Sequence, residues 1–127
     1  MRQPAVYVAS KSIHGPQWRA LRDAGLNIIS MWIDESGEGQ TVDWAALWDR
    51  CIAETKRADV LLLLHEPHET PKGSLVEMGA ALAKGLPIFY VGSPDLLSAL
   101  KHRNVRTFNT LPEAIAAIAT LRDELRA

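Results

Sequence analysis

Short apolar runs alternate with segments of helical periodicity along the whole chain. Five runs have the length and the β-branched or apolar composition of strands: residues 5–9, 26–33, 60–64, 87–92 and 105–108. The run VLLLL has no polar position, which is typical of a parallel strand covered on both faces. Helices are predicted between the runs, where apolar residues recur at helical spacing: 16–24, 43–57, within 72–87, 94–101 and from about Thr110 onward.

This alternation predicts an α/β fold, with residues 1–127 forming a single domain. We expect a doubly wound, flavodoxin- or Rossmann-like sheet of five parallel strands with helices on both faces. Ligands bind beyond the carboxyl ends of the strands in such sheets. A site should therefore be assembled from the loops that follow the strands: SKSIHG, WIDESGEG, HEPHETPKG and GSPDLL.

Composition and charge narrow the classes of partner. Fourteen Lys and Arg against 15 Asp and Glu leave no basic excess, so we expect no nucleic-acid polymer as a partner. No apolar run approaches the ~18–20 residues that span a membrane, so no membrane partner is expected. The single cysteine, Cys51, excludes an internal disulfide and fits a reducing cytoplasm. Neither G-x-G-x-x-G after the first strand nor a P-loop is present, and we predict no cofactor.

Two features invite a metal or nucleophile interpretation. The stretch HEPHE at 65–69 offers two histidines and two glutamates, but its spacing matches no zinc pattern, and Pro67 excludes a helical H-E-x-x-H. We interpret it as a solvated loop and predict no metal. Cys51 has no obvious histidine partner on an adjacent strand end, which favours a buried, inert thiol over a nucleophile.

Glu77 has two competing interpretations. Ser74-Leu-Val-Glu77 is an S-x-x-E capping box, a device worth about 1 kcal/mol, and Thr110 to Glu113 has the same form. However, Glu77 also lies where a loop enters a helix at the carboxyl edge of the sheet, beside small residues such as Gly73 that let a ligand approach. A carboxylate there could attack an electrophilic sugar carbon, as in retaining glycosidases.

The stretch KGSLVEMGAALAKGLPIFYVG, residues 72–92, resembles the signature of the nucleoside 2-deoxyribosyltransferase family. This family includes the 2′-deoxynucleoside 5′-monophosphate N-hydrolases. The matching positions are Gly73, Glu77, Gly79, Gly85 and Pro87. AVYVAS, ADVLLLL and LLSAL also resemble family segments, so that the resemblance covers nearly the whole chain.

The resemblance implies cleavage of the N-glycosidic bond of a nucleoside or nucleoside 5′-monophosphate. Glu77 would be the nucleophile that attacks C1′, and Tyr7 would orient it. Water would complete a hydrolysis, or a second base a transfer. Ser98 matches a serine that contacts the phosphate in the monophosphate hydrolases and comes from a neighbouring subunit. This favours hydrolysis slightly and implies a homodimer or a higher homo-oligomer.

Several other residues are candidates for substrate binding. Trp32 could stack on the base, although a core tryptophan explains it equally well, and the helix N-terminus at Ser74 would favour an anionic group. The full candidate set is Ser10, Lys11, Trp32, Asp34, Gly73, Ser74, Met78 and Ser98.

One position departs from the family pattern. An aspartate that helps to hold the sugar and the base is replaced here by Cys51, which leaves the proton for the departing base unassigned. Asp34, Asp43 or Glu69 could supply an acid from a loop. A non-catalytic nucleotide-binding or sensing domain with a degenerate site therefore stands as the alternative function.

Overall fold

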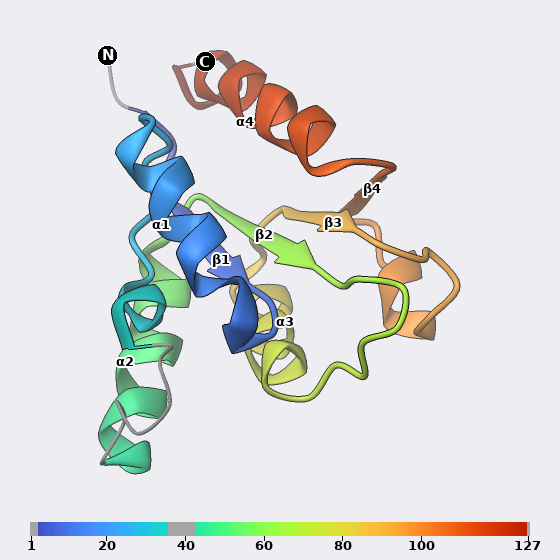
Figure 1. Cartoon of the computed structure of the whole chain (residues 1–127). Coiled ribbons are helices and arrows are strands. Elements are labelled where there is room, and N and C mark those ends of the chain that lie inside the picture. Colours follow the sequence, from blue (N-terminus) through green and yellow to red (C-terminus); the bar gives the residue numbers. More distant parts are fainter. Residues whose placement is uncertain (1–2, 36–42, 127) are drawn as a thin grey trace.

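The computed structural model describes residues 3–35 and 43–126 and is built around a sheet of four parallel strands (Figure 1). The strands are β1 (Val6–Ala9), β2 (Val60–Leu64), β3 (Ile88–Val91) and β4 (Val105–Phe108), and they lie in that order. Every residue of β1, β2 and β3 is buried, as their continuous apolar composition predicts. None of the described helices is both long and apolar enough to cross a membrane.

Helices cover both faces of the sheet, as expected. Helices α1 (Gly15–Asp23) and α4 (Leu111–Arg126) pack on one face, where Trp18 and Ile118 meet Val8, Leu62 and Phe89. Helices α2 (Trp44–Arg57) and α3 (Gly73–Lys84) pack on the other face (Figure 1). The remaining elements are short 3₁₀ helices: η1 (Ser12–His14), η2 (Met31–Glu35) and η3 (Ser98–Lys101).

The predicted fifth strand is wrong. Residues 26–33 meet β1 through a single bridge between Val6 and Ile28, and the chain then turns into η2. The Val8 N–H donates to the Ser30 hydroxyl at 3.1 Å, and the Val8 carbonyl accepts from the Trp32 indole N–H at 2.7 Å. Because two side chains satisfy these backbone groups, no strand backbone pairs with this part of the edge. The helix expected at 94–101 is likewise reduced to η3.

The register between β1 and β2 places the loops that follow these two strands side by side. Ala9, the last residue of β1, pairs with Leu63 of β2, so the chain leaves both strands at nearly the same height. The loop that begins at Ser10 and the loop that begins at His65 therefore start side by side. Helix α3 begins at the end of the second loop, which places its first turn at the carboxyl edge of the sheet.

Candidate active site

A pocket of about 200 Å³ lies at the carboxyl ends of β1 and β2. It is bounded by the loop after β1, by η2, by one face of α2 and by the first turn of α3. Its lining residues are Ser10, Lys11, Ser12, Trp32, Leu47, Trp48, Cys51, His65, Glu69, Pro71, Lys72, Gly73, Ser74 and Glu77.

Glu77 is buried in this pocket, with 6% of its surface exposed. The hydroxyl of Tyr7, a fully buried residue of β1, donates a hydrogen bond to Glu77 Oε2. Ser74 does not form the predicted capping box with Glu77, because α3 begins at Gly73 and the N-cap Lys72 makes no side-chain cap. Glu77 is thus held by a residue 70 positions away in the chain and not by its own helix terminus.

Burial raises the pKa of Glu77 to about 7, although the hydrogen bond from Tyr7 lowers it and the nearby Glu54 carboxylate raises it further. Burial also raises the pKa of Tyr7 far above its ordinary value. The phenol therefore keeps its proton and is the donor in the pair. A carboxyl group that ionises near neutral pH inside a pocket is a common property of catalytic acids and nucleophiles.

Cys51 lines the same pocket and is 4% exposed. Burial raises its pKa to about 11, although a hydrogen bond with Tyr7 lowers it. The thiol is therefore neutral at physiological pH and a poor nucleophile. Its burial confirms the prediction of a buried thiol.

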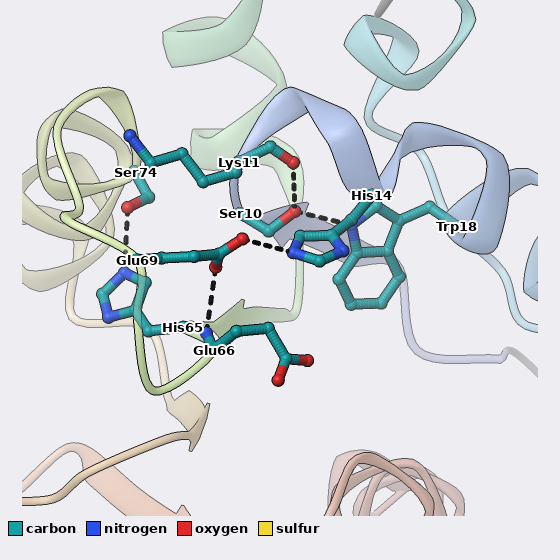
Figure 2. A network of polar contacts seen from close by, with 8 residues as sticks. All are labelled: Ser10, Lys11, His14, Trp18, His65, Glu66, Glu69 and Ser74. Atoms are coloured by element: carbon teal, nitrogen blue, oxygen red, sulfur yellow. Dashed lines mark hydrogen bonds and ion pairs between the residues drawn. The ribbon is translucent and has the colours of Figure 1, made fainter.

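A second polar network joins the end of β2 to α3 (Figure 2). His65 Nε2 lies 3.0 Å from Ser74 Oγ, and His65 Nδ1 lies 3.3 Å from the Tyr90 hydroxyl. Burial lowers the pKa of His65, so the imidazole is neutral. The interpretation of residues 65–69 as a solvated loop is wrong for His65, because this side chain is buried.

The Tyr90 hydroxyl that contacts His65 also lies close to Gly92. At Gly92, where φ is +153°, an added Cβ would lie 2.6 Å from this hydroxyl.

Glu69, which lines the pocket, connects the loop after β2 to η1 (Figure 2). Its Oε2 lies 2.7 Å from His14 Nε2, and its Oε1 accepts the Glu66 backbone N–H at 2.9 Å. Burial alone would raise the pKa of Glu69, but these two hydrogen bonds outweigh it and lower the pKa. Within the described ranges, no group of three or more His, Cys, Asp or Glu side chains could hold a metal ion.

The structure brings most of the sequence-predicted residues to this pocket. Ser10, Lys11, Trp32, Gly73, Ser74 and Glu77 line it, with Tyr7 directly behind Glu77. Trp32 is anchored through its indole N–H to the Val8 carbonyl. A Cβ on Gly73 would lie 3.2 Å from the Trp48 ring, so the missing side chain leaves room for the ring against α3.

Three candidates lie elsewhere. Asp34 is exposed and forms an ion pair with Arg22 at 2.8 Å, away from the pocket. Met78 is 2% exposed and belongs to the core between the sheet and helices α2 and α3. Ser98 is an exposed residue of η3 and does not line the pocket of its own chain.

Sequence reasoning did not assign Trp48, His65, Glu69 or Lys72 to substrate binding. Trp48 lies within the helix predicted at 43–57, and helical periodicity cannot distinguish a core position from a pocket wall. His65 carried a usable signal, since it directly follows a fully apolar strand at the edge where ligands bind.

Neither a scan against protein-family models nor a search of curated proteins gives a match. A search of solved structures finds a likeness to the CMP N-glycosidase BcmB of Clostridium botulinum, with a TM-score of 0.61. The two chains are 15% identical, and the match covers 92% of this chain and 98% of that one. The likeness shows a shared fold over nearly the full length of both proteins.

Proposed function

We propose that this protein cleaves the N-glycosidic bond of a nucleoside or nucleoside 5′-monophosphate, with Glu77 as the nucleophile. The observation that carries the proposal is the Glu77 carboxyl group, buried in a pocket on the Tyr7 hydroxyl with its pKa raised to about 7. The fold shared with an N-glycosidase and the resemblance at residues 72–92 support it.

In this reaction a Glu77 oxygen bonds to C1′ and the base departs with the electrons of the C1′–N bond. The result is a glycosyl ester, as in retaining glycosidases. Water then releases the sugar, or a second base accepts it. Tyr7 holds Glu77 Oε2 and thereby fixes the direction of the carboxylate toward the pocket.

Other lining residues fit a nucleotide. The Trp32 ring offers a face for base stacking, and its anchored N–H keeps the ring in place. Lys11, Lys72 and the N-terminus of the 12-residue helix α3 favour an anionic group such as a 5′-phosphate. These features favour a nucleoside 5′-monophosphate over an uncharged nucleoside as the substrate.

We further propose that the working unit is a homodimer or a higher homo-oligomer. The pocket, at about 200 Å³, is smaller than the roughly 300–1,000 Å³ of typical ligand sites, so part of a nucleotide would extend beyond it. Ser98 is exposed and outside its own pocket, and the family resemblance supports its contact with the phosphate in a neighbouring chain. Mixing Glu77→Gln chains with Ser98→Ala chains should then restore activity in hybrid sites. A fully active monomer would contradict this arrangement.

The test of the function is a panel of nucleosides and 5′-monophosphates, incubated with wild type and Glu77→Gln, with and without an acceptor base. Glutamine accepts the Tyr7 hydrogen bond but cannot form the ester, so base release should fall by several orders of magnitude. Free base in water indicates a hydrolase, and exchange alone a transferase. Binding without turnover would instead support a sensing domain, and an unimpaired Glu77→Gln variant would exclude Glu77 as the nucleophile.

A further inference from the structure

The buried network formed by Tyr90, His65 and Ser74 has no part in the steps proposed above, although one end of it reaches the pocket. Ser74 lines the pocket and is 5% exposed, whereas Tyr90 is fully buried and is not among the lining residues. Because a buried donor without an acceptor costs free energy, the partners in such a network determine where each hydrogen lies.

Tyr90 determines which imidazole nitrogen of His65 carries the hydrogen. Burial raises the pKa of Tyr90, so the phenol is protonated, and burial lowers the pKa of His65, so the imidazole carries a single hydrogen. Among the described residues, His65 Nδ1 at 3.3 Å is the one hydrogen-bond partner of the Tyr90 hydroxyl. With a hydrogen on Nδ1, the phenol proton would be buried without an acceptor. Nδ1 is therefore the acceptor, and the hydrogen of the imidazole lies on Nε2.

The backbone around this contact holds the two side chains in place. The His65 N–H donates to the Val91 carbonyl at 2.9 Å, which extends the pairing of β2 with β3 by one residue. The His65 and Tyr90 rings pack edge to face, with their centroids 5.3 Å apart. A Cβ at Gly92 would lie 2.6 Å from the Tyr90 hydroxyl, so the glycine leaves the space that this hydroxyl occupies beside His65.

The Nε2–H of His65 leaves the Ser74 hydroxyl with a hydrogen to donate (Figure 2). Nε2 lies 3.0 Å from Ser74 Oγ, so the imidazole donates and the hydroxyl oxygen accepts. Within the part of the chain that the structure describes, Ser74 Oγ has no other hydrogen-bond partner. Its own hydrogen therefore remains available to a ligand in the pocket that Ser74 lines.

The surroundings of Ser74 favour an anionic acceptor for that hydrogen. Ser74 lies in the first turn of α3, where backbone N–H groups have no partner within the helix and the helix dipole attracts negative charge. Lys11 and Lys72 line the same pocket. A phosphoryl oxygen accepts hydrogen bonds from hydroxyl, backbone and ammonium donors alike, and it fits this set of groups.

We propose that Ser74 donates a hydrogen bond to a phosphoryl oxygen of a nucleoside 5′-monophosphate, and that His65 and Tyr90 are positioning residues that keep the Ser74 hydrogen directed at this ligand. The proposal deepens the function proposed above and rests on it for the identity of the ligand. Tyr90 donates to His65, His65 donates to Ser74, and Ser74 donates to the phosphate. No proton is transferred, so the network selects the substrate and takes no part in bond cleavage.

The test measures binding, so that its result does not depend on turnover. Isothermal titration calorimetry with Glu77→Gln chains compares AMP, GMP, CMP and UMP, and their 2′-deoxy forms, each with its own nucleoside. Ser74→Ala in this background should weaken binding of the best monophosphate by about 10- to 100-fold relative to its nucleoside, as expected for loss of a hydrogen bond to a charged group. Ser93→Ala removes a hydroxyl from an exposed residue outside this pocket and should leave the ratio of the two affinities unchanged.

Tyr90→Phe separates a positioning role from a structural one. It keeps the ring that packs against His65 and removes only the hydroxyl that donates to Nδ1. The imidazole hydrogen should then lie partly on Nδ1, and Ser74 would donate to Nε2 in those molecules. Nitrogen NMR of histidine-labelled protein, with the His65 signal identified by its loss in His65→Gln, should show Nε2–H in wild type and a mixture in Tyr90→Phe. A competent fraction of about one third would weaken monophosphate binding about threefold relative to the nucleoside.

The outcomes distinguish this inference from the proposed function, and thermal unfolding of each variant verifies that it is folded. If Ser74→Ala leaves the affinity ratio unchanged while wild type releases base from a monophosphate, the function stands and the contact with phosphate is overturned. A hydrogen on Nδ1 in wild type, or a Tyr90→Phe variant with the wild-type ratio, would overturn the role of His65 and Tyr90. Monophosphate binding that depends on Ser74, in a wild type that releases no base, would overturn the proposed function and retain this inference. A protein that binds no monophosphate better than its nucleoside would overturn this inference outright.

Discussion

Replacing Glu77 by Gln should stabilise the protein, and the gain should grow with pH. The wild-type carboxyl has its pKa raised by burial from 4.5 to about 7. Folding therefore favours its protonated form. Between pH 4.5 and 7 the native state binds more protons than the unfolded state, so this group makes stability fall as pH rises. Below pH 4.5 the penalty is absent, and above pH 7 it is complete.

The size of the effect follows from the two pKa values. A difference of about 2.5 units at 1.36 kcal/mol per unit gives about 3 kcal/mol of destabilisation above pH 7. Glutamine has nearly the same shape, accepts the Tyr7 hydrogen bond and carries no charge. For a chain of 127 residues, about 3 kcal/mol corresponds to roughly 10 °C in the unfolding midpoint.

The assay is urea unfolding of both proteins at pH 4.5, 6, 7 and 8. The stability difference should be near zero at pH 4.5 and reach about 3 kcal/mol by pH 8, while carboxyl groups that do not interact with Glu77 cancel in the comparison. Glu66→Gln, which removes a partly exposed carboxylate, is the control and should show no such rise. A difference that is constant with pH, or a less stable Glu77→Gln at pH 8, would refute the reasoning.

Three further predictions concern the surroundings of the site. Tyr7→Phe removes the hydrogen bond that lowers the pKa of Glu77, so the rising limb of the kcat/KM pH profile should move to higher pH. A limb that does not move would show that Tyr7 does not set the pKa of Glu77. Cys51 should resist iodoacetamide in the folded protein at neutral pH and react after unfolding in urea, and alkylation that abolishes native activity would contradict this. Cys51→Ala should stay active and lower the free energy of unfolding by about 1 kcal/mol. Gly92→Ala should destabilise the fold by about 2 kcal/mol or more in urea unfolding, and by less in a Tyr90→Phe background, because the added Cβ would meet the Tyr90 hydroxyl. Equal destabilisation in both backgrounds would exclude this clash as the cause.

The strands were predictable only where composition decides pairing. VLLLL and the run that becomes β3 form strands as expected. The run LNIISMWI has a similar composition but does not extend the sheet, because Ser30 and Trp32 side chains bond the backbone of Val8. The pattern of apolar residues does not show where side chains will compete with a strand for backbone hydrogen bonds.

The two S/T-x-x-E motifs show the same limit at helix termini. Thr110 accepts the Glu113 backbone N–H at 3.3 Å, as a cap should. Ser74 and Glu77 have the same spacing but are buried, and each has a hydrogen-bond partner outside α3: His65 for Ser74 and Tyr7 for Glu77. Because local spacing does not reveal burial, it does not predict which of the two motifs forms a helix cap.

The contact between Tyr7 and Glu77 could be predicted from the sequence, but the contact between His14 and Glu69 could not. Glu77 and Tyr7 were recognised through family-like segments, and the structure confirms that they are in contact. The contact between His14 and Glu69 joins residues 55 positions apart. It depends on how two loops fold over the sheet edge, which no local pattern specifies.

The central claim is that Glu77 forms a covalent bond with the sugar. The most direct measurement is mass spectrometry of peptides from enzyme quenched in acid during turnover of its best substrate. We predict that the peptide spanning 73–84 gains the mass of one glycosyl unit, that fragmentation places it on Glu77, and that Glu77→Gln shows none. Release of base with this peptide unmodified at every quench time, or a modification on another residue, would contradict the account.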